Sequence, residues 1–224
     1  MAEHNRTMTD SLPSLDTPWT RLDAASVADL LADTEARWWL SGGSAYDQWR
    51  GEPLRERDRT TISTVYTQLD DIVGSLPDGM SCWARIGDEL VRWSDLPDGA
   101  DIPSAWIFDA AMDAWVLQIN LEDGTADRWV YRRDPRLQLP WEKAVLDIDD
   151  IPTGAPEVQL VWKALRPYPD DEADKDVILP ALPEEARTWW EKAILSIHPH
   201  STWSIHVRSP FAPAKASWNR TRRS

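Results

Sequence analysis

The sequence predicts a mixed α/β fold, in which a small mixed β-sheet with helices is followed by a helical C-terminal part. Apolar residues alternate along residues 115–122, as in a strand with one buried face. After residue 156 they recur instead at the three- and four-residue spacing of helices. A chain of 224 residues with 42% hydrophobic residues is also long enough for one compact domain or two small ones.

Short elements are expected before residue 80. The first 18 residues are rich in Ser, Thr, Asp and Pro and are expected to form a flexible arm. Capping residues, apolar runs and β-branched residues then mark alternating helices and strands. The predicted elements are a helix capped by Ser26, a strand over 38–40, a helix over 45–50, a strand over 60–66 and a helix over 69–76.

Residues 80–134 are expected to form a β-meander. Its clearest strand is predicted to bury one set of side chains and to leave the other set on an open face. The buried set is Trp115, Leu117, Ile119 and Leu121, and the open set is Val116, Gln118, Asn120 and Glu122. A turn at residues 122–124 predicts a partner strand over 128–133.

Two helices are predicted in the C-terminal part. Pro156 and Pro183 each stand where a first helical residue is expected, and the charged stretch 167–176 between these helices is interpreted as a turn. The predicted organisation is an arm over 1–18, an α/β domain over 19–150, a helical subdomain over 151–207 and a basic flexible tail over 208–224.

Charge and composition exclude several classes of function. The net charge is −14, which disfavours nucleic acids and anionic membrane surfaces as partners, although a local site can still bind a free nucleotide. The single cysteine, Cys82, excludes a disulfide framework. Residues 1–15 lack the apolar segment of a signal peptide and no apolar run is long enough to span a membrane, so a cytoplasmic location is expected.

The turn formed by Gly42, Gly43 and Ser44 is a candidate binding element. Glycines let backbone N–H groups approach a ligand, the following helix N-terminus attracts phosphate, and the serine adds a hydroxyl donor. The same pattern is also typical of an ordinary strand-to-helix connection.

The stretch from Trp38 to Gly51 resembles the opening of aminoglycoside and lincosamide nucleotidyltransferases and their bacterial relatives. Trp129 to Pro135 resembles a Trp-x-x-Arg-Arg-Asp-Pro segment of that family, and Pro156 to Lys163 resembles its Pro-Glu-x-x-Leu-x-x-Lys helix. The resemblance covers about residues 20–205 and implies a nucleotidyltransferase-like core. It also implies that Lys163 lies among the ligand-binding residues.

The chain departs from this family where the metal ligands are expected. Nucleotidyl transfer uses two Mg²⁺ ions, which the family holds with an Asp-x-Asp/Glu pair. Aligned to the family, that pair falls on Arg59 and Thr61, and a third acidic position falls near Gln118. We expect no metal site there, and Arg59 can instead pair directly with phosphate. The weak catalytic candidates that remain are Asp58 and Glu122.

Other candidate sites are less specific. His198, His200 and His206 could bind a transition metal, but their spacing is more typical of exposed loop residues. Cys82 is expected to be a buried structural thiol. The acidic residues Asp147, Asp149 and Asp150 are expected to form a solvated loop.

Three functions are compatible with these residues. The first is a protein that has lost metal-dependent transfer and binds a nucleotide or small molecule through Arg59, Thr61, Gln118, Asn120 and Lys163, together with the Gly-Gly-Ser turn. The second is an active enzyme that modifies a hydroxyl group of an aminoglycoside- or lincosamide-like compound with ATP and Mg²⁺. The third is a metal-free biosynthetic enzyme that uses the same cleft. The resemblance also allows a homodimer.

Overall fold

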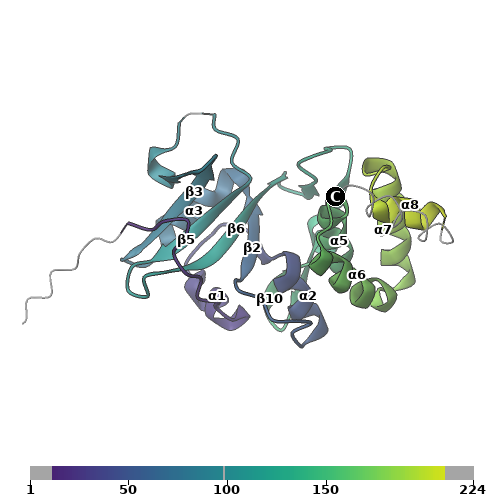
Figure 1. Cartoon of the computed structure of the whole chain (residues 1–224), viewed down its shortest axis with the longest axis horizontal. Helices are drawn as coiled ribbons and strands as arrows, with labels where there is room; N and C mark the ends of the chain where they lie inside the picture. The colour runs from purple at the N-terminus through teal and green to yellow at the C-terminus, as the bar shows by residue number, and fades with distance from the viewer. Residues whose placement is uncertain (1–11, 98, 210–224) are drawn as a thin grey trace, which may run out of the picture. The chain divides into compact units, whose positions relative to one another are not determined.

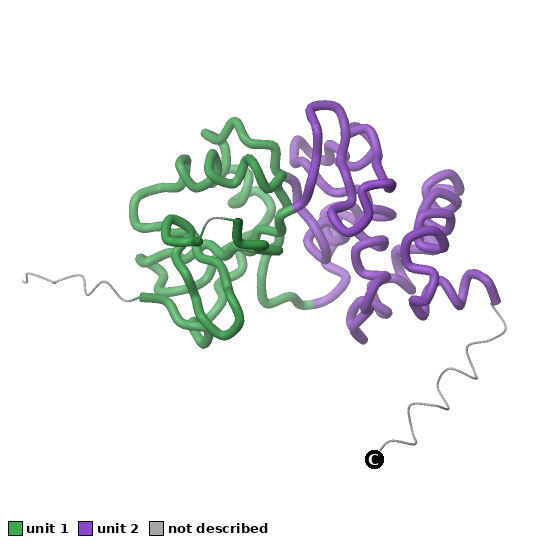
Figure 2. The backbone as a smooth tube through the Cα atoms, turned by 90° about the horizontal axis from the view of Figure 1, so that it is seen from above, with its two compact units in different colours: residues 1–38, 56–121 green, residues 39–55, 122–224 purple. Residues whose placement is uncertain are grey.

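The computed structural model describes residues 12–97 and 99–209, and the mixed α/β fold is confirmed. The chain divides into two compact units: residues 1–38 with 56–121 form unit 1, and residues 39–55 with 122–224 form unit 2 (Figure 2). The strand β6, Ala114–Gly124, carries residues of both units. Elements far apart in the sequence therefore build each unit.

Unit 1 is built around an antiparallel meander of strands (Figure 1). Its strands, in spatial order, are β4 (Glu89–Arg92), β3 (Met80–Ile86), β5 (Ser104–Asp109), β6 and β2 (Thr61–Val65). The helices of this unit are α1 (Ala24–Leu30) and α3 (Leu69–Ser75). Asp23, rather than the predicted Ser26, caps α1, because its carboxylate accepts a hydrogen bond of 2.7 Å from the backbone N–H of Ser26.

A β-bulge changes the predicted faces of β6. Leu117 lies opposite Ile107, but Trp115 lies opposite Phe108, so Val116 is the extra residue. Cross-strand partners share a face, and Phe108 therefore brings Trp115 onto the face that also carries Gln118. The prediction that Trp115 shares a face with Leu117 is wrong, because strict alternation fails at a bulge.

An aromatic cluster fills the core on this face of unit 1. Trp115 is fully buried, and its ring centroid lies 5.4 Å from that of Trp106 and 5.6 Å from that of Phe108. The segment before α1 is attached to β6 next to this cluster by two backbone hydrogen bonds. Thr20 N–H donates to Trp115 O, and Trp115 N–H donates to Pro18 O. Residues 12–18, which the sequence predicted to be part of a flexible arm, belong to the described structure, whereas residues 1–11 lie outside it.

Unit 2 combines short strands with most of the helices (Figure 1). β1 (Trp38–Leu40) pairs in parallel with β10 (Ile151–Gly154), which forms an antiparallel hairpin with β9 (Val145–Ile148). Its remaining elements are α2 (Gly42–Arg50), β7 (Arg128–Val130), β8 (Gln138–Pro140), α4 (Trp141–Ala144), α5 (Pro156–Ala164), α6 (Pro169–Ala181), α7 (Glu184–Ile197) and α8 (Thr202–Arg208).

Several local predictions in unit 2 need correction. The glycines at 42 and 43 are the first residues of α2 rather than a separate turn. The stretch predicted as a turn over 167–176 contains the start of α6, which begins at Pro169 with three acidic residues in its first turn. The expectation for the acidic loop is confirmed, since Asp147, Asp149 and Asp150 are exposed, and Asp149 and Asp150, with positive φ, form the turn of the β9–β10 hairpin. The predicted basic tail lies outside the described residues from Pro210 onward.

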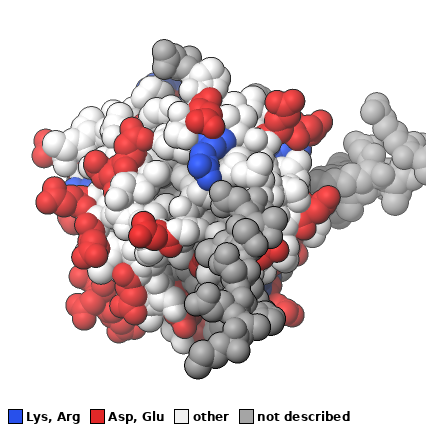
Figure 3. All heavy atoms as spheres, turned by 90° about the vertical axis from the view of Figure 1, so that its left-hand side faces the viewer, with Lys and Arg blue, Asp and Glu red and all other residues white. Residues whose placement is uncertain are grey.

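Charge is distributed unevenly between the units. The described residues of unit 1 include no Lys, and acidic side chains dominate the face shown in Figure 3. The described lysines, Lys143, Lys163, Lys175 and Lys192, all belong to unit 2.

Candidate functional site

The N-terminus of α2 is held by a side chain from a distant helix. Ser41, the N-cap residue, makes no side-chain capping bond. Instead, the backbone N–H of Gly42 donates a hydrogen bond of 2.8 Å to Oε1 of Gln159 on α5. Gly42 has a φ of +56°, a conformation that glycine adopts without strain. The next residue, Gly43, also lies in the first turn of α2, where a backbone N–H group has no carbonyl four residues earlier in the same helix to bond to.

Lys163 lies beside this helix end. A Cβ atom added to Gly42 would stand 4.0 Å from Cε of Lys163. The Lys163 ammonium is 2.8 Å from Oδ1 of Asp171, and 34% of the lysine side chain is exposed. The side chain of a partly exposed lysine thus passes the positive end of the α2 dipole at Gly42, and a cation near a helix N-terminus favours an anion.

Sequence reasoning missed the acidic residues of α6 that organise this region. Asp171 also accepts a hydrogen bond of 2.9 Å from the backbone N–H of Tyr168 through Oδ2, so one carboxylate caps α6 and holds Lys163. Arg55 lies 2.9 Å from Asp170 and 3.1 Å from the buried Asp174. A signal for α6 was available in Pro169 followed by three acidic residues, but nothing in the sequence linked them to Arg55 or Lys163.

The predicted residues of unit 1 form a second group. The Arg59 guanidinium forms a bidentate ion pair with Asp58, with Nε–Oδ1 and Nη2–Oδ2 distances of 3.0 and 2.7 Å. It also lies 4.5 Å above the ring centroid of Trp19 and donates to Gln118 at 3.5 Å. Gln118 in turn donates to Asn120. Arg59 is therefore held in place by protein groups of its own unit.

The structure does not place all predicted residues in one unit. Gly42, Gly43, Ser44 and Lys163 belong to unit 2. Thr61, which is the first residue of β2, belongs to unit 1 together with Arg59, Gln118 and Asn120.

Glu122, one of the two weak catalytic candidates, is buried in unit 2 rather than open as predicted. Its Oε2 accepts hydrogen bonds from the indole N–H of Trp129 and, at 3.1 Å, from that of Trp162. Two indole donors on one oxygen stabilise a buried carboxylate, since each N–H replaces a lost contact with water.

His198 belongs to a buried polar pair and is not one of the exposed loop residues that the sequence predicted. Its Nε2 lies 2.9 Å from the Tyr131 hydroxyl, and both side chains are buried. Burial, followed by the positive charge of Arg133, lowers the pKa of His198, while Asp134 opposes the shift. Burial raises the pKa of Tyr131. Both rings are therefore neutral near pH 7.

This burial predicts a pH dependence of stability. Because the His198 pKa is lower in the fold than its ordinary value of 6.5, the unfolded chain binds more protons below that pH, and stability falls on acidification through the folded pKa. We expect His198→Gln, which can still bond to Tyr131, to reduce the loss of stability between pH 7.5 and pH 5. Urea unfolding of both proteins at the two pH values checks this, and identical losses would contradict it.

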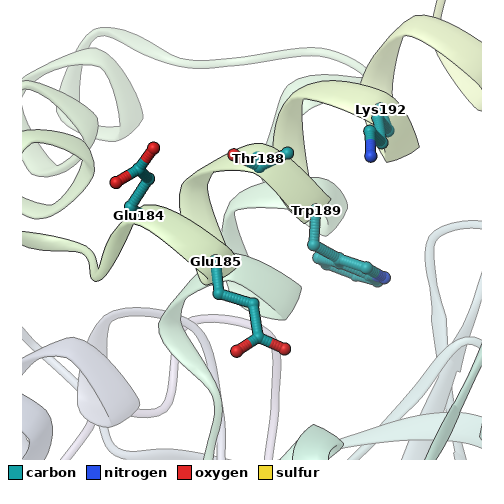
Figure 4. Close-up of a pocket in the computed structure, with 5 residues that line it drawn as sticks. All are labelled: Glu184, Glu185, Thr188, Trp189 and Lys192. Carbon is teal, nitrogen blue, oxygen red and sulfur yellow. The ribbon is translucent and has the colours of Figure 1, made fainter.

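A shallow hollow lies on the surface of α7 and is lined by Glu184, Glu185, Thr188, Trp189 and Lys192 (Figure 4). Glu185 and Trp189, one helical turn apart, point to the same side of the helix. Glu185 also lies 3.3 Å from Lys143 of α4. Carboxylates and ammonium groups occur together here, so the hollow favours no particular charge in a ligand.

Metal-binding and membrane-spanning features are absent from the described part of the chain. In residues 12–97 and 99–209, no three His, Cys, Asp or Glu side chains gather in a way that could hold a metal ion. Cys82 is buried, as predicted, and burial raises its pKa to about 12, which makes it an inert thiol. None of the described helices has the length and apolar character needed to cross a membrane.

No family model and no curated protein sequence matches the chain. Among solved structures it is similar to the lincosamide antibiotic adenylyltransferase LnuA bound to lincomycin, with 16% identity, a TM-score of 0.49 and coverage of 72% of this chain and 97% of that one. The solution structure of the antibiotic-resistance factor ANT(2'')-Ia matches at 13% identity and a TM-score of 0.35, covering 88% and 92%. Its crystal structure with adenylyl-2''-tobramycin matches at 12% and 0.39, covering 78% and 85%. Each is a distant likeness in fold.

Proposed function

We propose that this chain binds a phosphate-bearing small molecule, such as a nucleotide, at the N-terminus of α2. The observation that carries the proposal is the approach of the Lys163 side chain to this helix end, with its Cε 4.0 Å from a Cβ built on Gly42. Backbone N–H groups and a lysine together provide the donors and the positive charge that a phosphate group needs. Asp171 balances the lysine while no anion is bound, and it leaves two of the three ammonium hydrogens for a ligand.

We further propose that binding occurs without metal-dependent nucleotidyl transfer. Mg²⁺ requires carboxylate oxygens that can be turned toward the ion. The Asp58 carboxylate is engaged on both oxygens by Arg59, and Oε2 of Glu122 is engaged by two indole groups. Arg59 itself stands at a position where the resemblance implies an acid. The residues present therefore fit a pair of Mg²⁺ ions poorly.

Calorimetric titration tests both parts of this proposal. We expect inorganic tripolyphosphate and ATP to bind, adenosine to bind far more weakly, and the affinity to fall as salt is raised from 50 to 300 mM. Adding Mg²⁺ should not increase the affinity of the protein for ATP. Absence of tripolyphosphate binding would refute the phosphate site. Metal-dependent tightening, with pyrophosphate release when an aminoglycoside or lincosamide is added, would instead establish an active transferase.

Lys163 provides a specific prediction. Its removal alone would leave Asp171 buried without its cation, so the test variant is Lys163→Met combined with Asp171→Asn. We expect tripolyphosphate affinity to fall by about tenfold, the value of one charge-assisted hydrogen bond. Asp171→Asn alone separates the loss of the acid from the loss of the cation. Lys192→Met, in the α7 hollow, is the matched control. A loss seen with Lys192→Met but not with the double variant would place the ligand in that hollow.

A further inference from the structure

Gly154, at the end of β10, leaves a space that the side chain of Gln159 occupies. A Cβ atom added at Gly154 would lie 2.3 Å from Nε2 of Gln159 and 3.1 Å from the carbonyl oxygen of Leu40. The first distance is far below van der Waals contact. The backbone of Gly154 does not have a positive φ, so the requirement for glycine here comes from this close approach and not from conformation.

The amide of Gln159 is unusual for a buried side chain. Only 2% of the residue is exposed, and its Nε2 has no hydrogen-bond partner, whereas Oε1 accepts from Gly42 N–H. A buried amide with an unused donor costs free energy. An apolar side chain would avoid that cost but would leave Gly42 N–H without an acceptor, because Ser41 does not cap the helix. The observed arrangement therefore favours capping of α2 over satisfaction of Gln159 itself.

We propose that Gln159, seated in the space left by Gly154, is the positioning residue of the phosphate site. This inference rests on the proposed function and deepens it. Gln159 engages Gly42 N–H and so fixes the direction of the first turn of α2, while the ligand binds the amide of Gly43 and the Lys163 ammonium. The β1–α2 junction is distant in sequence from the consecutive elements β10 and α5, and the packing of these segments against one another is required for the site to form.

A double-mutant cycle tests this coupling. Its members are Gly154→Ala, Gln159→Ala and the double variant, each measured for urea stability and for tripolyphosphate affinity. In the presence of Gln159, Gly154→Ala should displace the amide and lower affinity by about tenfold, together with a loss of stability. In the Gln159→Ala background only the contact of the added methyl group with the Leu40 carbonyl oxygen at 3.1 Å remains, so Gly154→Ala should lower affinity and stability much less than it does when Gln159 is present. Additive effects would overturn the proposal.

A second variant separates the hydrogen bond from packing. Gln159→Met conserves the volume but offers no strong acceptor to Gly42 N–H. We expect it to bind tripolyphosphate several-fold more weakly while its thermal unfolding midpoint stays close to that of the wild type. Wild-type affinity in Gln159→Met would overturn the positioning role. Failure of the wild-type protein to bind tripolyphosphate would instead refute the proposed function, and the stability arm of the cycle would still show whether Gly154 and Gln159 are coupled.

Discussion

Replacing Glu122 with Ala is expected to lower the free energy of unfolding by about 4 kcal/mol, because two buried indole N–H groups lose their common acceptor and a cavity is left. The indole N–H groups of Trp129 and Trp162 both donate to Oε2 of this carboxylate. Trp129 and Glu122 are almost completely buried. Urea unfolding followed by circular dichroism measures the loss. A change below about 1 kcal/mol would show that the carboxylate is not the acceptor that holds these side chains.

Two further variants keep this test informative if Glu122→Ala does not fold. Glu122→Gln retains an acceptor oxygen and should have an intermediate effect. Trp162→Phe removes one of the two donors and should cost about 1–2 kcal/mol. Glu122→Gln should also leave tripolyphosphate affinity unchanged, since the proposed site uses Gly42 and Lys163. Loss of binding in this variant would give Glu122 a role in the ligand site.

Trp115→Ala is expected to lower the free energy of unfolding by about 4 kcal/mol, which is typical of truncating a buried tryptophan. Trp115 is completely buried, its ring packs against those of Trp19, Trp106 and Phe108, and its indole N–H donates to Ser14 O. The variant therefore loses core packing and an attachment point of residues 13–20. The loss would be measured by urea unfolding.

Trp93→Ala is the matched control for Trp115→Ala. Trp93 is only partly buried, contacts Tyr66 and donates to Asp70 in an exposed bond of 2.7 Å. Its removal should cost about 1 kcal/mol or less. Equal losses for the two tryptophans would mean that the aromatic cluster around Trp115 is not the main core of unit 1.

The elements that the sequence predicted best have strong local patterns. β6 contains the alternating stretch 115–122, and α5 and α7 begin at or next to the prolines that mark their first turns. α6 was missed because its many charged residues give it no clear apolar stripe, even though Pro169 and the acidic first turn mark its start. The bulge at Val116 left no recognisable mark either, since bulges depend on the partner strand.

The sequence alone determined the mixed α/β class, the helical C-terminal part and the candidate glycines at the start of α2. These features depend on hydrophobic periodicity and on proline and glycine, which influence the backbone over only a few residues. Only the tertiary structure decided what holds those glycines. Gln159 is 117 residues from Gly42, and Arg55 is 119 residues from Asp174. No local pattern encodes such partners, because they are fixed by how strands and helices pack and not by propensity. Likewise, burial rather than residue type decided that Glu122 accepts indole hydrogen bonds.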